Sequence, residues 1–416
     1  MEYLPRVVDQ EISELQAMAG AILIEGARAC GKSATGRHHS RSHIQLDIDQ
    51  NARRLAEIDE SLLLDGDKPR FIDEWQVIPG VWNQVRASVD SAQTPGQYVL
   101  AGSAVPADDH TRHSGAGRIL RMRMRPMSLF ESGQSSGQAS LKEILAGGLL
   151  KPQRSPLTVR ALAERTVIGG WPGLQRLGAD QAQRFLRSYL ADVARVDLPA
   201  LEDEPRRDAA RTGLLIRSLA RSVGTEASFS TISADMGPVG GLSARSVSAY
   251  HQALERIFVV EDQPAWSPKL RSKDRIRAAV KRHFVDPSLG AAALGAGPDR
   301  LLGNLEYFGQ LFESLVVRDL RIYTQASGGH VMHVRDSRNR EIDAIIEFPN
   351  GQWAALEIKL GANAEDRAAQ SLTAFIDNVD QAASGPPLAK IIVTGGEFAY
   401  TRPDGIHVVP IGLLGP

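Results

Sequence analysis

Short apolar runs separated by amphipathic stretches dominate the first third of the chain. Ala21–Glu25 (AILIE) is apolar except at its last residue. Four further β-type runs follow, at 43–49, 69–75, 96–104 and 118–124. Helical patterns separate these runs, as at Val81–Val89. Because buried strands that alternate with helices are typical of βαβ units, the pattern predicts a parallel sheet.

The pattern becomes helical after the loop-rich stretch at 132–140 (SGQSSGQAS) and stays so to about residue 295. Three helical stretches there precede two strand-like runs, FVVEDQPAW and AVKRHFVD. Three helices followed by a two-stranded ribbon is the order of a winged helix, which contacts either nucleic acid or protein. The last hundred or so residues again mix strands and helices.

Composition narrows the class of protein. Lys and Arg total 48 and Asp and Glu total 49 among 416 residues, so the net charge of −1 gives no global attraction to nucleic acid. One cysteine excludes an intrachain disulfide framework and a multi-cysteine zinc site. No apolar run reaches the roughly 18 residues of a membrane span, and the charged N-terminus does not resemble a signal peptide. These features predict a cytoplasmic protein with no membrane contact.

A phosphate-binding motif follows the first strand. Gly26 to Ser33 (GARACGKS) matches G-x-x-x-x-G-K-[ST], with an apolar strand before it and a helical pattern after it. In such a loop the two glycines, Gly26 and Gly31, let backbone N–H groups face phosphate. Lys32 reaches the phosphate oxygens and the Ser33 hydroxyl binds Mg²⁺. The motif therefore predicts ATP and Mg²⁺ as cofactors.

An acidic pair ends the predicted strand at 69–75. Asp73 would hold Mg²⁺ and Glu74 would polarise the attacking water, as nucleotide hydrolysis requires. A solvated acidic strand end would give the same pattern. Ser103, at the end of the next run, would bind the water or the γ-phosphate, although a turn serine is an equally good interpretation.

Basic segments supply two further candidates. The stretch 112–125 holds five arginines and no acid, and Arg118 is the predicted arginine finger, which in trans requires a homo-oligomer. A solvated strand edge is the alternative. The stretch 269–283 is rich in Lys and Arg, and it predicts phosphate contacts with DNA. Its proposed contacts are Lys269, Arg271, Lys273, Arg275 and Arg277.

The tail carries the pattern D-x₁₃-E-x-K. Glu357 and Lys359 are two apart on a predicted strand, so their side chains share a face. Asp343 lies in the preceding strand, and the FPNGQ turn predicts an antiparallel hairpin. Two carboxylates that converge there would hold Mg²⁺ for phosphodiester cleavage, with Glu313 completing the metal site and Lys359 orienting the nucleophile. A charged surface hairpin would show the same pattern.

These motifs together resemble a bacterial and archaeal family of AAA-type ATP-binding proteins. The matching stretches run through most of the chain: YLPRVVD, LIEGARACGKSAT, RFIDEWQ, LAGSA, HSGAGRI, MRPMSLFESG, GGWPGL and EIDAIIE…WAALEIK. The resemblance implies phosphate and Mg²⁺ roles for Gly31, Lys32 and Ser33, and the acidic-pair role for Asp73 and Glu74. It also implies a C-terminal domain of unknown function related to PD-(D/E)XK nucleases, and an AAA-like oligomer.

We therefore predict an α/β protein in three parts. A P-loop ATPase domain would cover 1–135, a winged-helix-like segment 156–295, and a nuclease-like α/β domain 300–416. The predicted function is ATP hydrolysis coupled to action on DNA, with metal-dependent cleavage by the tail. The alternative is an ATP-dependent switch or DNA-binding regulator whose tail is non-catalytic, which slow turnover or a footprint without cleavage would reveal.

Overall fold

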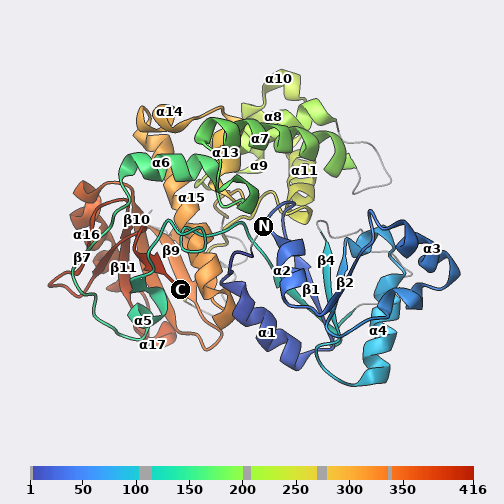
Figure 1. Ribbon diagram of the computed structural model, residues 1–416. Helices are drawn as coiled ribbons and strands as arrows, with labels where there is room; N and C mark the ends of the chain where they lie inside the picture. Colours follow the sequence, from blue (N-terminus) through green and yellow to red (C-terminus); the bar gives the residue numbers. More distant parts are fainter. Residues whose placement is uncertain (1–2, 103–114, 200–207, 269–278, 336–339) are drawn as a thin grey trace. The chain divides into compact units, whose positions relative to one another are not determined.

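The computed structural model describes residues 3–102, 115–199, 208–268, 279–335 and 340–416. The chain folds into two compact units (Figure 1). The N-terminal unit contains residues up to 126 together with 197–206 and 253–258. The C-terminal unit contains 127–196, 207–252 and 259–416, so the helical middle and the tail belong to one unit. The three predicted domain limits stay a prediction.

A five-stranded parallel sheet forms the centre of the N-terminal unit, in the order β2-β3-β4-β1-β5. The strands are β1 (Ala21–Glu25), β2 (Ser42–Gln45), β3 (Arg70–Asp73), β4 (Tyr98–Gly102) and β5 (Ile119–Arg123). Each pairing is parallel, as the alternation of apolar runs and helices predicts. The α/β fold class is confirmed.

Helices cover both faces of this sheet, which is why its central strands are apolar without alternation. They are α1 (Val8–Met18), α2 (Lys32–His38), α3 (Gln50–Ile58) and α4 (Val81–Ala92). Leu23 and Leu100 share a core with Trp75 and Trp82, whose ring centroids lie 4.9 Å apart. Helix α1 did not show in the apolar pattern, because it buries only Val8 and Ile12.

The middle of the chain is helical, as predicted. Its main helices are α6 (Val159–Ile168), α7 (Ala179–Asp192), α8 (Ala209–Arg221), α9 (Phe229–Asp235), α11 (Ala244–Arg256) and α13 (Pro287–Ala293). The two strand-like runs that follow α11 meet only in isolated antiparallel bridges, Val260 to Phe284 and Gln263 to Lys281. Pro264 lies inside the first run, and a proline cannot donate to a ladder. The winged-helix assignment stays a prediction.

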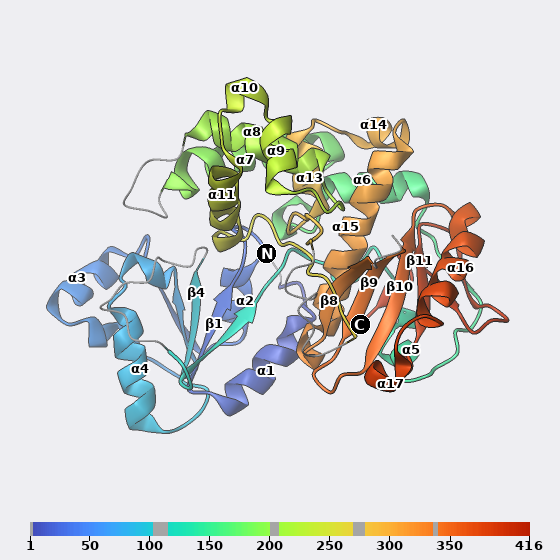
Figure 2. The ribbon, with the colours of Figure 1, turned by 180° about the vertical axis from the view of Figure 1, so that it is seen from behind.

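The tail folds around a second sheet, of order β7-β12-β13-β11-β10-β9-β8 (Figure 2). In chain order its elements are α15 (Leu305–Thr324), β8 (His330–Arg335), β9 (Glu341–Glu347), β10 (Trp353–Lys359), α16 (Glu365–Ile376), β11 (Lys390–Thr394), β12 (Phe398–Thr401) and β13 (His407–Pro410). Strands β9 and β10 are antiparallel, which confirms the predicted hairpin, whereas β10 and β11 are parallel. Both α15 and α16 pack on this sheet.

A buried ionic network lies in the C-terminal unit. Arg318, on α15, donates to Asp286 at 2.7 Å and to Asp319 at 2.9 Å. Asp286 also accepts from the backbone N–H of Gly170 at 2.9 Å, and Asp319 from that of Leu129 at 3.0 Å. The network therefore ties two of the family-like motifs, MRPMSLFESG and GGWPGL, to a single helix.

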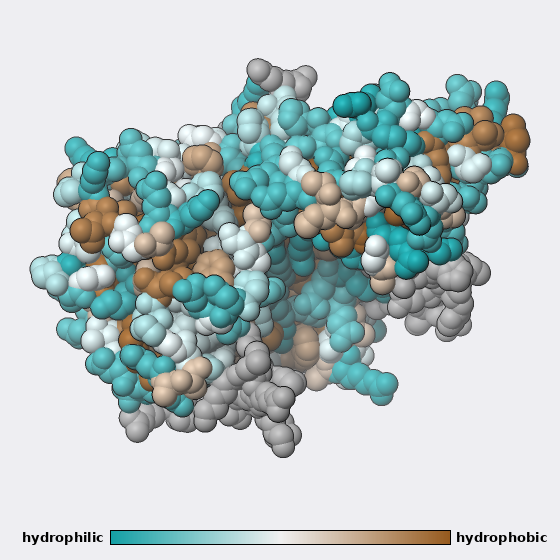
Figure 3. Space-filling view, turned by 90° about the horizontal axis from the view of Figure 1, so that it is seen from below, coloured by the Kyte–Doolittle hydropathy of each residue, from teal (hydrophilic) through white to brown (hydrophobic). Residues whose placement is uncertain are grey.

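On the face drawn in Figure 3, hydrophilic side chains predominate and apolar residues lie in separate patches. Within the part of the chain that the structure describes, no helix combines the length and apolarity that crossing a membrane requires.

Candidate functional sites

The phosphate-binding loop joins β1 to α2 in the N-terminal unit. Gly31 caps α2 with a φ of 110°, in the left-handed region that glycine adopts without strain. A side chain at Gly26 would bring its Cβ within 2.1 Å of the Met124 carbonyl oxygen. The conformation of the loop therefore depends on glycine at these two positions, as the phosphate-binding motif requires.

Lys32 lies over this loop. Its Nζ donates to the carbonyl oxygens of Gly26 and Ala27, each at 2.8 Å, and the residue is buried. Phosphate oxygens would replace these neutral acceptors with charged ones, which bind an ammonium more strongly. The ammonium is therefore already placed where the motif requires it.

Asp73 ends β3 and meets the loop through Ser33. The Asp73 carboxylate is 1% exposed and lies close to the Ser33 hydroxyl. Burial raises the pKa of Asp73, and the nearby Ser33 hydroxyl offsets part of that rise. The Asp73 Oδ2 atom makes no hydrogen bond with any described residue. An unsatisfied carboxylate oxygen beside a hydroxyl is a donor set that suits Mg²⁺.

Glu74 turns away from the strand that precedes it. Its φ of 53° and ψ of 45° lie in the left-handed region, which is strained for a residue with a side chain. Its carboxylate accepts a hydrogen bond from the Gln76 side chain. Gln76 was not among the predicted site residues, although it lies only two positions after Glu74.

Of the two other predicted residues of this site, the structure describes only Arg118. Ser103 lies outside the described residues. Arg118 precedes β5 and pairs with Asp90 at 2.8 Å. Because β5 runs parallel to β1, with Ile119 opposite Ala21, Arg118 lies at the edge of the sheet opposite the loop. It is not part of its own chain's loop.

The basic stretch at 269–283 is described only from residue 279. Lys269, Arg271, Lys273, Arg275 and Arg277 lie outside the described residues. Lys281 is 1% exposed, and Arg282 pairs with Asp262 and lies 4.3 Å from the centroid of the Phe229 ring. Including Lys281 and Arg282 in an exposed stripe was therefore wrong, because both are buried by acidic and aromatic partners.

The predicted tail residues do converge. The Lys359 Nζ lies 2.6 Å from Asp343 Oδ2 and 2.5 Å from Glu357 Oε2. Asp343 also accepts from the backbone N–H of Ile358 at 2.8 Å. The antiparallel register explains the meeting, because Leu356 lies opposite Ala344 and so brings Glu357 beside Asp343.

Glu313, on α15, joins the same cluster through Lys281, which the sequence did not suggest as a residue of this site. The Lys281 Nζ lies 2.7 Å from Glu313, 2.6 Å from Glu341 and 3.7 Å from Asp343. We call these six side chains the tail cluster: Lys281, Glu313, Glu341, Asp343, Glu357 and Lys359. Glu341 shares a strand face with Asp343 by the two-residue period, so a sequence signal for it existed.

The tail cluster holds four carboxyl groups and two lysines, which shift one another's pKa values. Burial raises the pKa of Glu313 to about 7 and that of Glu357 to about 8, and in both the Asp343 charge adds to the rise. Burial would also raise the pKa of Asp343, but Lys359 and Lys281 hold it below its usual value. Burial would lower the pKa of Lys281, but the charges of Glu313, Asp343 and Glu341 keep it above its usual value.

His333, on β8 near this cluster, predicts a loss of stability in mild acid. Burial and the nearby Lys281 charge lower its pKa to about 4. Between the unfolded pKa of about 6.5 and that value, only the unfolded chain gains a proton, so stability is present above pH 6.5 and falls with pH. The cost at pH 5 is about 2 kcal/mol. Urea unfolding at pH 7.5 and pH 5 measures this decrease in the free energy of unfolding, which should be smaller in His333→Asn than in wild type. Equal decreases in the two proteins would contradict the prediction.

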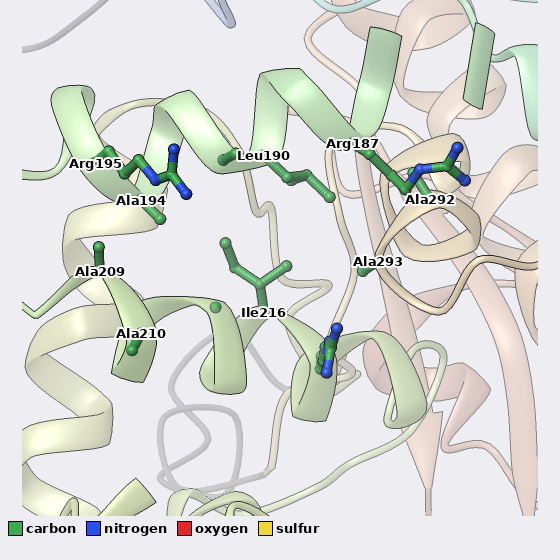
Figure 4. A pocket seen from close by; sticks show the side chains of 12 residues that line it. Arg187, Leu190, Ala194, Arg195, Ala209, Ala210, Ile216, Ala292 and Ala293 are labelled. Atoms are coloured by element: carbon green, nitrogen blue, oxygen red, sulfur yellow. The ribbon is translucent and has the colours of Figure 1, made fainter. Parts of the chain in front are cut away.

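A separate cavity of about 540 Å³ lies between α7, α8 and α13. Leu190 and Ile216 extend toward each other across it (Figure 4). Three arginines, Arg187, Arg195 and Arg217, are among its lining residues. None of the predicted site residues lines it.

Three family models match successive parts of the chain. Residues 19–132 match an AAA domain. Residues 159–300 match DUF8612 and residues 308–414 match DUF4143, both described as domains of unknown function. The chain therefore carries an AAA-type ATPase domain of the P-loop kind, which confirms that part of the predicted resemblance, and it continues into domains of unknown function.

Two further comparisons, with curated proteins and with solved structures, show little similarity. No curated protein matches the chain. Among solved structures, the Walker-type ATPase Paby2304 of Pyrococcus abyssi matches at 12% identity and a TM-score of 0.43, covering 69% of this chain and 94% of its own. A DNA replication initiation factor matches at 12% identity and 0.23, covering 60% and 92%. Drosophila ORC bound to DNA matches at 12% and 0.20, covering 69% and 84%. No function follows from scores this low.

Proposed function

We propose that the protein binds ATP with Mg²⁺ at Gly26–Ser33 and hydrolyses it there. The observation that carries this proposal is the buried Asp73 carboxylate beside Ser33, one oxygen of which makes no hydrogen bond with any described residue. The same loop holds the Lys32 ammonium. The match of residues 19–132 to an AAA domain supports it.

Each side chain of the loop then has one role. Ser33 and Asp73 would hold Mg²⁺, which neutralises charge on the bound phosphates. Lys32 binds the terminal phosphates, and Glu74 orients the attacking water and accepts its proton. Ser103 is assigned to the γ-phosphate. Arg118 acts only in trans, from a second copy in a homo-oligomer, because its own loop is at the other edge of the sheet.

The test is ATP binding and phosphate release by wild type and Lys32→Ala. Loss of a charge-assisted hydrogen bond should weaken ATP binding about 10- to 100-fold. Lys142→Ala, at an exposed lysine of the other unit, is the matched control. Unchanged ATP affinity in Lys32→Ala, or no phosphate release by wild type, would refute the proposal.

A second candidate function is cleavage of DNA by the tail, through a PD-(D/E)XK-like site. Glu313, Asp343, Glu357 and Lys359 meet at the end of an antiparallel hairpin followed by a helix and a parallel strand. The three acids are the residues that would hold Mg²⁺ once the ammonium groups that contact them in this structure have moved away. The chemistry it would supply is activation of water beside a phosphodiester.

We expect Mg²⁺- or Mn²⁺-dependent strand breaks in supercoiled, branched or single-stranded DNA, with and without ATP. Asp343→Ala and Lys359→Ala should remove them. Breaks that persist in both variants would come from a contaminant, and their absence in wild type would favour an ATP-dependent switch or DNA-binding regulator with a non-catalytic tail. In that case Lys269, Arg271, Lys273, Arg275 and Arg277 remain the candidate DNA contacts.

A further inference from the structure

Lys281 lies where the acids of the tail cluster converge. Its ammonium is within hydrogen-bonding distance of Glu313 and Glu341, and it lies 3.7 Å from Asp343. The side chain is 1% exposed, so solvent does not reach it. A buried ammonium among carboxylates offsets part of their negative charge, as a bound cation would.

The backbone holds Lys281 in this place. Its N–H donates to the Gln263 carbonyl at 3.0 Å, and its own carbonyl accepts from the Gln263 N–H at 2.9 Å. The Gln263 side chain donates in turn to the Asp343 carbonyl at 3.0 Å. The next residue is fixed as well, since the Arg282 N–H donates to Thr225. Backbone hydrogen bonds at Lys281 and at Arg282 therefore fix the position of Lys281 in the cluster.

The second lysine neutralises the other side of the cluster. Lys359 contacts Asp343 and Glu357, so each of the three acids that a metal would need already contacts an ammonium. A divalent ion bound by these oxygens would approach them to about 2.0–2.6 Å. It would have to share the oxygens of Glu313 and Asp343 with the Lys281 Nζ, which lies 2.7 Å from the one and 3.7 Å from the other, and the two positive charges would repel. The residues as arranged do not fit a metal.

We propose that Lys281 is the resident cation of the tail cluster, and that a divalent ion binds there only when Lys281 is removed or withdraws. The inference deepens the second candidate function, since it makes the segment at 279–285 the control of metal entry. Its test measures metal binding without DNA, so a failure of cleavage and a failure of this proposal remain distinguishable.

Mn²⁺ binding to the full-length protein, measured by electron paramagnetic resonance, tests the proposal. Mn²⁺ should bind Lys281→Met at least about tenfold more tightly than wild type, because one positive charge a few ångströms away is lost. Adding Glu313→Gln to Lys281→Met should remove the gain. Lys390→Met, at a lysine of β11 outside the cluster, is the matched control and should bind like wild type. Equal affinity in wild type and Lys281→Met, or no binding by either, would overturn the proposal.

Wild type provides a second measurement, which needs no folded Lys281→Met variant. In protein labelled with ¹⁵N at lysine Nζ, the Lys281 signal is assigned by its loss in Lys281→Arg. Millimolar Mg²⁺ should leave that signal unchanged. A Mg²⁺-dependent shift that disappears in Glu313→Gln would show that the metal binds beside Lys281, and the proposal would be wrong.

Discussion

Replacing Glu74 by glutamine should reduce ATP hydrolysis about 100-fold or more, the usual contribution of a positioned general base, while ATP still binds. Glutamine keeps the size and the hydrogen-bonding oxygen of Glu74 but cannot accept the proton of the attacking water. Lys32, Ser33 and Asp73 are unchanged in this variant, and they carry the phosphate and Mg²⁺ contacts of the proposed site. Phosphate release and equilibrium ATP binding, measured on the same preparation, separate the two effects.

Glu57→Gln is the matched control, since Glu57 is an exposed glutamate of α3 in the same unit. It should hydrolyse ATP at the wild-type rate. Gln76→Ala should give an intermediate loss, because the Gln76 side chain donates a hydrogen bond to the Glu74 carboxylate and so helps to orient it. If Glu74→Gln turns over at the wild-type rate, another group activates the water and Glu74 only ends the strand.

The loop could be predicted from the sequence because its chemistry is local. Gly26 to Ser33 are contiguous, and the strand and helix on either side are set by short-range patterns. Asp73 also followed from position, since parallel strands present their carboxyl ends along one edge of the sheet. The position of Arg118 could not be predicted in this way. A strand has two ends, and the arginine-rich pattern does not show at which end of β5 a residue lies.

The rest of the tail cluster depends on contacts between distant segments. Lys281 lies 32 positions before Glu313 and 62 before Asp343, and nothing in AVKRHFVD distinguishes a buried lysine from a solvated one. The run contains both basic and apolar residues. Its pairing with Gln263 is a tertiary contact, which the local sequence does not determine. Sequence patterns therefore predict the acids but not the cation that neutralises them.

The same holds for Arg318, whose role became visible only with Asp286 and Asp319 around it. Arg318→Met should lower the free energy of unfolding of the C-terminal unit by about 3–5 kcal/mol, the usual cost of leaving a buried charge without its partner. Both aspartates are fully buried, and the two segments they hold, at Leu129 and Gly170, would lose their anchor. Arg187→Met is the matched control, and as an exposed change it should stay within about 0.5 kcal/mol.

The pH dependence of this loss distinguishes charge from packing. Burial already raises the pKa of Asp319 to about 6, and Arg318 is what holds it down. Without Arg318 the folded pKa of Asp319 would rise further above the unfolded value, so the folded state would bind a proton that the unfolded chain releases. The stability deficit of Arg318→Met should therefore shrink as pH falls from 8 to 5.5, since protonation removes the unpaired charge. Urea unfolding at both pH values measures it. A deficit that is the same at both would mean that Arg318 stabilises the unit by packing alone.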